Sequence, residues 1–108
     1  MALMGTPMDT PRYLCSHLVR LVTDDREQWV NLEEIWAAGA VLGCEEEVEE
    51  GTLVLILSDD QSFEAQVTAV KLDEPGWRLE VAFSPLTPWT AEKWLPEHAF
   101  DPAKLGLL

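Results

Sequence analysis

Hydrophobic and polar residues alternate most regularly in two neighbouring segments, residues 63–69 and 77–83. In both segments every second residue is apolar, which is the period of a β-strand with one buried face. Residues 73–76 (DEPG) lie between them, and their proline and glycine favour a tight turn. The pattern therefore predicts an antiparallel hairpin. The alternation slips after Val70, which indicates a β-bulge or a strand end at that point.

Four further segments have the composition of strands, and they cover residues 14–23, 28–35, 40–44 and 53–57. The last of these, LVLIL, is the most apolar part of the chain, and its length is typical of a strand rather than a helix. Six short strands at intervals of about ten residues, separated by turn-forming residues, predict an all-β antiparallel barrel or sandwich. A six-stranded closed barrel is favoured because closure leaves no strand edge exposed.

The two ends of the chain lack this alternation. Residues 1–11 contain two prolines and a glycine, and they predict a flexible N-terminal arm ahead of a barrel over residues 12–84. In residues 85–108, Thr90 is placed to cap a short helix from Ala91 to Leu95, which the next proline would end. We expect this C-terminal helix and extension to pack on the barrel.

The chain of 108 residues has a formal net charge of −13. This charge repels phosphate backbones and anionic lipids, which argues against nucleic-acid binding and membrane insertion. No apolar run approaches the roughly 20 residues of a membrane-spanning helix, and the N-terminus lacks the pattern of a secretion signal, so we expect a cytoplasmic protein. The five glutamates within residues 45–51 predict a solvated connection, because burying them would be costly. The simplest interpretation of the overall acidity is solubility.

Few residues suggest catalysis or metal binding. The cysteines and histidines are Cys15, His17, Cys44 and His98, and no CxxC or HxxxH spacing relates them. A zinc site is therefore disfavoured, and we expect both cysteines to be reduced and to pack as small apolar residues. The chain has no GxSxG, P-loop or glycine-rich dinucleotide motif. We predict a protein that is not an enzyme and has no metal site.

Five tryptophans leave two interpretations open. Trp77 falls on the buried phase of its strand, and Trp89 and Trp94 could fix the C-terminal segment on the mouth of the barrel. Trp29 and Trp36 lie in the segment before Gly39. Tryptophans that fill a small core are the favoured interpretation, and the alternative is an exposed aromatic patch that binds a protein partner.

Two segments carry a resemblance to a known family. Residues 11–21 (PRYLCSHLVRL) place Arg12 just before the first strand, and residues 31–42 (NLEEIWAAGAVL) place Gly39 where a polar stretch meets an apolar strand. In the order and spacing of these features, roughly residues 8–84 resemble the PilZ domain family, bacterial β-barrels that bind the second messenger cyclic di-GMP. The family pattern is RxxxR before the first strand and [D/N]xSxxG between the second and third strands. The resemblance implies a role in bacterial signalling.

Only two of the five motif positions match. Arg12 is the second arginine of RxxxR and Gly39 is the glycine, but Met8 replaces the first arginine, Glu34 the Asp or Asn, and Trp36 the serine. The resemblance implies that paired guanidinium groups would stack on guanine and bind phosphate. Losing one charge-assisted bidentate contact costs about 1.5–3 kcal/mol. The indole of Trp36 would also fill space that a purine needs.

We therefore predict a PilZ-like protein-interaction module whose cyclic di-GMP binding is lost or weakened, with Arg12, Glu34, Trp36 and Gly39 as the residual ligand site. No other cofactor is expected, the partner is a protein of unknown identity, and the chain would be a monomer or a weak homodimer. The alternative is a cyclic di-GMP receptor with an altered site, in which Arg12 and Arg20 together bind the ligand. Simpler explanations are a turn with positive φ for Gly39 and an ordinary surface charge for Arg12.

Overall fold

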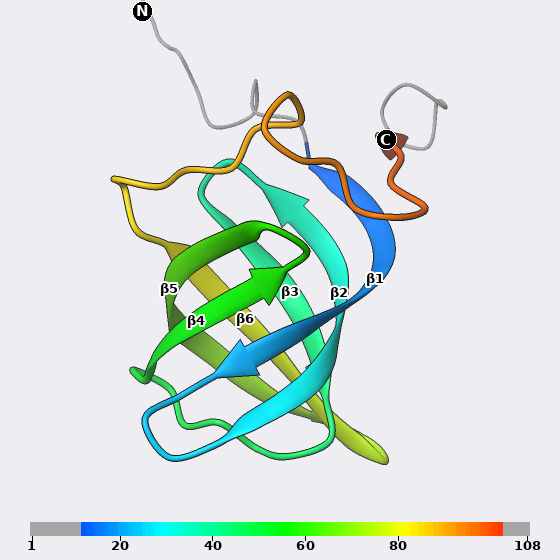
Figure 1. The fold of residues 1–108 in the computed structure, drawn as a ribbon. Helices are drawn as coiled ribbons and strands as arrows, with labels where there is room; N and C mark the ends of the chain where they lie inside the picture. The colour runs from blue at the N-terminus through cyan, green and yellow to red at the C-terminus, as the bar shows by residue number, and fades with distance from the viewer. Residues whose placement is uncertain (1–11, 103–108) are drawn as a thin grey trace, which may run out of the picture.

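The computed structural model of the protein describes residues 12–102, which form six strands and a C-terminal segment. The strands are β1 (Tyr13–Val22), β2 (Glu27–Trp36), β3 (Gly39–Cys44), β4 (Leu53–Ser58), β5 (Gln61–Asp73) and β6 (Gly76–Phe83). They close into a barrel in the order β1-β2-β3-β6-β5-β4, with every neighbouring pair antiparallel (Figure 1). The predicted all-β, six-stranded antiparallel barrel is confirmed.

The hairpin of β5 and β6 follows the alternation read from the sequence. Phe63, Ala65 and Val67 are buried, and the residues between them are exposed. Asp73 pairs with Gly76 across the turn. The pairing of the two strands shifts between Val67 and Ala69, so β5 contains a β-bulge, which lies just before the slip that the sequence places after Val70. The strand continues to Asp73.

The barrel closes where the last three residues of β1 pair with β4. β3 and β6 are distant in the chain but adjacent in the barrel. They pair with each other because β2 already occupies the other edge of β3 and β5 occupies the other edge of β6. Inward side chains from all six strands form one apolar core. Its largest fully buried members are Phe63, Leu21, Leu32, Ile35, Leu42 and Leu79.

A bulge in β2 decides the placement of two glutamates. The pairing of β2 with β3 shifts between Leu32 and Glu34. Leu32 and Ile35 are both buried although three positions apart, so Glu33 and Glu34 between them both lie outside the core. This irregularity brings Glu34 to the surface beside the start of β1, where it pairs with Leu14.

The short helix predicted from Ala91 to Leu95 is wrong, because the described part of the C-terminal segment, residues 84–102, contains no α-helix. The N–H groups of Lys93 and Trp94 bond to the carbonyl of Thr90, at N···O distances of 3.0 and 3.3 Å, and this makes a single turn. Prolines on both sides of the turn leave too few residues to offset the cost of helix nucleation.

The C-terminal segment lies over one end of the barrel, near the start of β1 (Figure 1). Leu14 and Phe100 exchange two backbone hydrogen bonds of 2.9 Å. Trp89 is only 2% exposed and belongs to the core cluster. The segment is therefore part of the packed domain. The predicted N-terminal arm and residues 103–108 lie outside the described residues, within which no helix has the length and apolarity needed to cross a membrane.

Candidate functional site

Three of the four predicted site residues meet at the start of β1. Arg12 precedes this strand, and Glu34 lies beside it on β2. Nε and Nη2 of Arg12 both contact Oε1 of Glu34, at 2.8 and 2.7 Å. The Glu34 side chain is 19% exposed and that of Arg12 is 49% exposed. The polar edge of the guanidinium group is therefore directed at a half-buried carboxylate of the same chain.

Trp36 covers the flat face of the same guanidinium group. Cζ of Arg12 lies 4.0 Å from the centroid of the indole ring, which is a cation–π contact. Guanine stacking uses a flat face of a guanidinium group, and forked hydrogen bonding to phosphate uses one of its polar edges. In Arg12, one face and one edge are occupied by side chains of the protein itself. The first arginine position of the family motif, Met8, lies outside the described residues.

Gly39 adjoins this cluster, but not for the reason expected from the sequence. The expectation that a turn requires positive φ at Gly39 is wrong, because Gly51, at φ 92°, is the one described glycine in the left-handed region. A Cβ atom on Gly39 would instead collide with the carbonyl oxygen of Val81 on β6, and would lie 3.1 Å from Cζ2 of Trp36. Glycine is needed here because β6 and the indole approach the backbone closely.

The two histidines of the chain have different settings. Nδ1 of His17 accepts the N–H of Glu97 at 3.0 Å, so the proton of the neutral ring is on Nε2, which faces Oγ of Ser58 at 3.1 Å. With its proton on Nε2, the ring cannot take the proton of Ser58, and the pair has the geometry of a structural contact. Sequence reasoning missed Ser58, whose only signal was its inward phase at the end of β4. His98 is exposed, and no group of metal-ligating side chains occurs among residues 12–102.

The tryptophans divide between the two interpretations. Trp89 is buried, and its indole N–H donates to the carbonyl of Trp94 at 2.7 Å. Trp94 and Trp77 are partly buried and pack against the core. These three are core anchors, as the favoured interpretation predicted. Trp29 is 63% exposed on the outer face of β2.

Both cysteines are free thiols with raised pKa values. Burial, followed by the negative charges of Glu34 and Glu33, raises the pKa of Cys15 from 9.0 to about 12. Burial, followed by the charge of Glu46, raises the pKa of Cys44 from 9.0 to about 11. Because only the thiolate is nucleophilic, neither cysteine is suited to catalysis.

We expect the folded protein to react slowly with iodoacetamide near neutral pH. The raised pKa values lower the thiolate fraction roughly 1,000-fold at Cys15 and roughly 100-fold at Cys44 relative to free cysteine. Protonated thiols stabilise the fold fully below pH 9.0, and this contribution is lost as the pH rises from 9.0 toward 11 and 12. Mass spectrometry of the alkylated protein, with urea-unfolded protein as the control, measures both rates. A folded-state rate within tenfold of the unfolded one would contradict the expectation.

No protein-family model and no curated protein matches this chain. The structure therefore shows the fold, a six-stranded antiparallel barrel.

Proposed function

We propose that this protein is a non-enzymatic, PilZ-like module of bacterial signalling that acts by binding a protein partner in the cytoplasm and has lost or weakened cyclic di-GMP binding. The resemblance of the two sequence segments suggests the family. The barrel and the position of Arg12 before its first strand agree with that suggestion.

The observation that carries the proposal is the internal pairing of Arg12. A cyclic dinucleotide that used the same face and edge of the guanidinium group would have to displace both the indole of Trp36 and the carboxylate of Glu34. A charge-assisted hydrogen bond contributes about 1.5–3 kcal/mol and the cation–π contact about 0.5–1 kcal/mol, although exposure to solvent reduces both. A ligand phosphate would also meet the repulsion of a chain with a net charge of −13.

The alternative, a receptor in which Arg12 and Arg20 share the ligand, has less support. Arg20 bonds to Glu27 at 2.9 Å through its Nη1 atom. Arg12 and Arg20 are eight positions apart, which is roughly 25 Å of extended strand. Two guanidinium groups this far apart along a strand are poorly placed to hold one cyclic dinucleotide.

Calorimetric titration with cyclic di-GMP tests the proposal. We expect no saturable binding by the natural chain at low micromolar ligand. The variant Met8→Arg/Glu34→Asp/Trp36→Ser restores the family motif and should gain at least tenfold in affinity, since the one restored arginine contact contributes about 1.5–3 kcal/mol.

Matched controls assign any gain to the motif. Adding Arg12→Ala to the restored variant should abolish its binding, whereas adding Arg20→Ala should leave it unchanged. Saturable low-micromolar binding by the natural chain that Arg12→Ala removes would overturn the proposal.

A further inference from the structure

The outer face of the barrel is unusually apolar along β4. Val54, Ile56 and Ser58 of this strand point inward and are buried. The alternate residues, Leu53, Leu55 and Leu57, therefore point outward; Leu53 is 74% exposed, and Leu55 and Leu57 are partly buried. Exposed apolar positions that adjoin one another commonly mark an interaction site.

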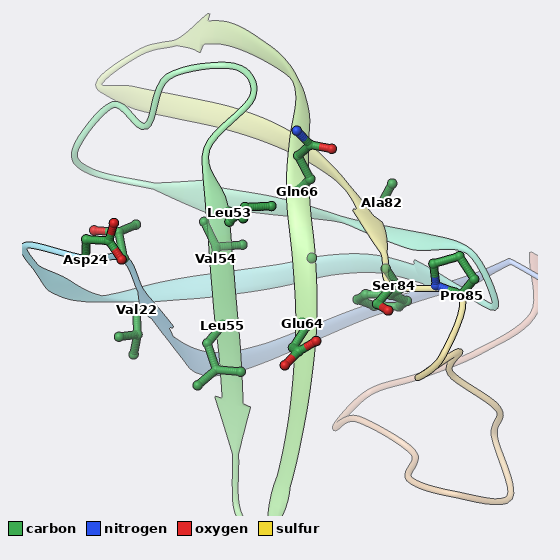
Figure 2. Close-up of a pocket in the computed structure, with 13 residues that line it drawn as sticks. Val22, Asp24, Leu53, Val54, Leu55, Glu64, Gln66, Ala82, Ser84 and Pro85 are labelled. Atoms are coloured by element: carbon green, nitrogen blue, oxygen red, sulfur yellow. The ribbon is translucent and has the colours of Figure 1, made fainter.

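Leu53 and Leu55 line a groove of about 840 Å³ on this face. Figure 2 shows them beside Gln66 and Glu64 of β5, with which they pair across the sheet. Val22 and Asp24 lie on one side, and Ser84 and Pro85 on the other.

The charge around the groove has one sign. Its charged lining residues are Asp24 and Glu64, and none of the lining residues is Lys or Arg. The acidic segment, residues 45–50, leads to one end of it, where the Gln66 side chain donates to the carbonyl of Gly51 at 3.1 Å. All four arginines of the chain are already paired with carboxylates, namely Arg12, Arg20, Arg26 and Arg78. An occupant of this groove therefore needs positive charge as well as apolar surface.

The closed barrel limits how a protein segment can bind. The floor of the groove is paired sheet, because β4 pairs with β5 from the Leu53/Gln66 pair to the Ser58/Gln61 pair and β5 pairs with β6 from Ala65 onward, so a partner cannot insert a strand between them. Recognition has to use side chains that enter the groove, which is how an amphipathic helix binds.

We propose that this groove binds an amphipathic helix of a partner protein, with aliphatic residues against Leu53 and Leu55 and lysines or arginines against Asp24, Glu64 and the acidic segment. This inference rests on the proposed function, an interaction module, and gives it a surface and a partner class. The groove also adjoins the candidate site, because one cross-strand row runs through Gly39, Ala82, Gln66 and Leu53. Leu53 is three strand spacings from Gly39, roughly 14 Å, so a change there does not touch Arg12.

Fluorescence anisotropy with a labelled synthetic peptide tests the proposal on the full chain. The probe is a helix of about 14 residues with leucines on one face and lysines on the other. We expect saturable binding at about 0.15 M salt. One comparison peptide has alanine in place of leucine and the other has glutamate in place of lysine, and both should bind at least tenfold more weakly.

The variant Leu53→Lys should weaken binding of the leucine–lysine peptide at least tenfold. Leu72→Lys is the matched control, because Leu72 is also an exposed strand leucine, at 61%, but does not line the groove. Unfolding in urea checks that both variants fold, and if Leu53→Lys does not, Glu64→Lys replaces it with Glu80→Lys as its control.

Equal effects of the paired variants, equal binding of the alanine peptide, or preference for the glutamate peptide would each overturn the groove proposal. Absence of saturable binding by the leucine–lysine peptide would do the same. Cyclic di-GMP binding by the natural chain would instead overturn the proposed function, and it is measured separately.

Discussion

Replacing Trp89 with alanine is expected to lower the free energy of unfolding by about 3–5 kcal/mol. The indole is 2% exposed and lies in the core cluster. It contacts Tyr13 edge-on, with ring centroids 5.4 Å apart, and its N–H donates to the carbonyl of Trp94. The substitution removes the apolar burial, the ring contact and the hydrogen bond together, and it leaves a cavity where the C-terminal segment meets the barrel.

Urea denaturation followed by circular dichroism measures this loss. Trp29→Ala is the matched control, because Trp29 is 63% exposed and its removal should change stability by less than about 0.5 kcal/mol. Limited proteolysis adds a local measurement, since Trp89→Ala should expose residues 84–102 to cleavage before the barrel unfolds. Equal unfolding midpoints for the two variants would show that Trp89 does not anchor the segment.

Replacing Gly39 with alanine is expected to lower the free energy of unfolding by about 3 kcal/mol. Its new Cβ atom would collide with the carbonyl oxygen of Val81 and crowd Trp36. Gly39 pairs with Ala82 at the junction of β3 and β6, so relieving the collision requires these strands to separate. Backbone atoms cannot move aside as cheaply as the end of a flexible side chain.

Gly43→Ala is the matched control in the same strand. Its Cβ atom would meet Oε2 of Glu33 at 2.6 Å, and that carboxylate can rotate away. We expect Gly43→Ala to cost less than about 1 kcal/mol, as measured by urea denaturation under the same conditions. If the two variants lost the same stability, close backbone approach would not be the reason for glycine at position 39.

These two results bear on the function as well as the fold. A stability loss in Gly39→Ala would mean that packing is sufficient to explain the glycine at one of the two matching motif positions. The other matching position, Arg12, is held by Glu34 and Trp36. Contacts within the barrel would then explain both matching motif positions. We would expect a partner to bind at another surface, such as the groove beside Leu53.

The sequence by itself determined the features that depend on local periodicity. The alternation in residues 63–69 and 77–83 predicted β5 and β6, and its slip after Val70 lies close to the bulge between Val67 and Ala69. The charge of residues 45–50 predicted a solvated connection, and all five of its glutamates are exposed. Periodicity reports which side chains of one strand are buried, and together with the turn residues it is sufficient for the strand count and the all-β class.

Only the tertiary structure decided which residues meet. Arg12 and Glu34 are 22 positions apart, and their contact depends on the register of β1 with β2 and on a bulge in each strand. In LVLIL every residue is apolar, so no alternation could reveal that Leu53, Leu55 and Leu57 face outward. Gly39 is constrained by Val81 of β6 (Gly76–Phe83) and not by its own turn. This strand begins 37 residues after Gly39. Register and strand approach are properties of the closed barrel, because each is fixed by contacts between segments that local sequence does not relate.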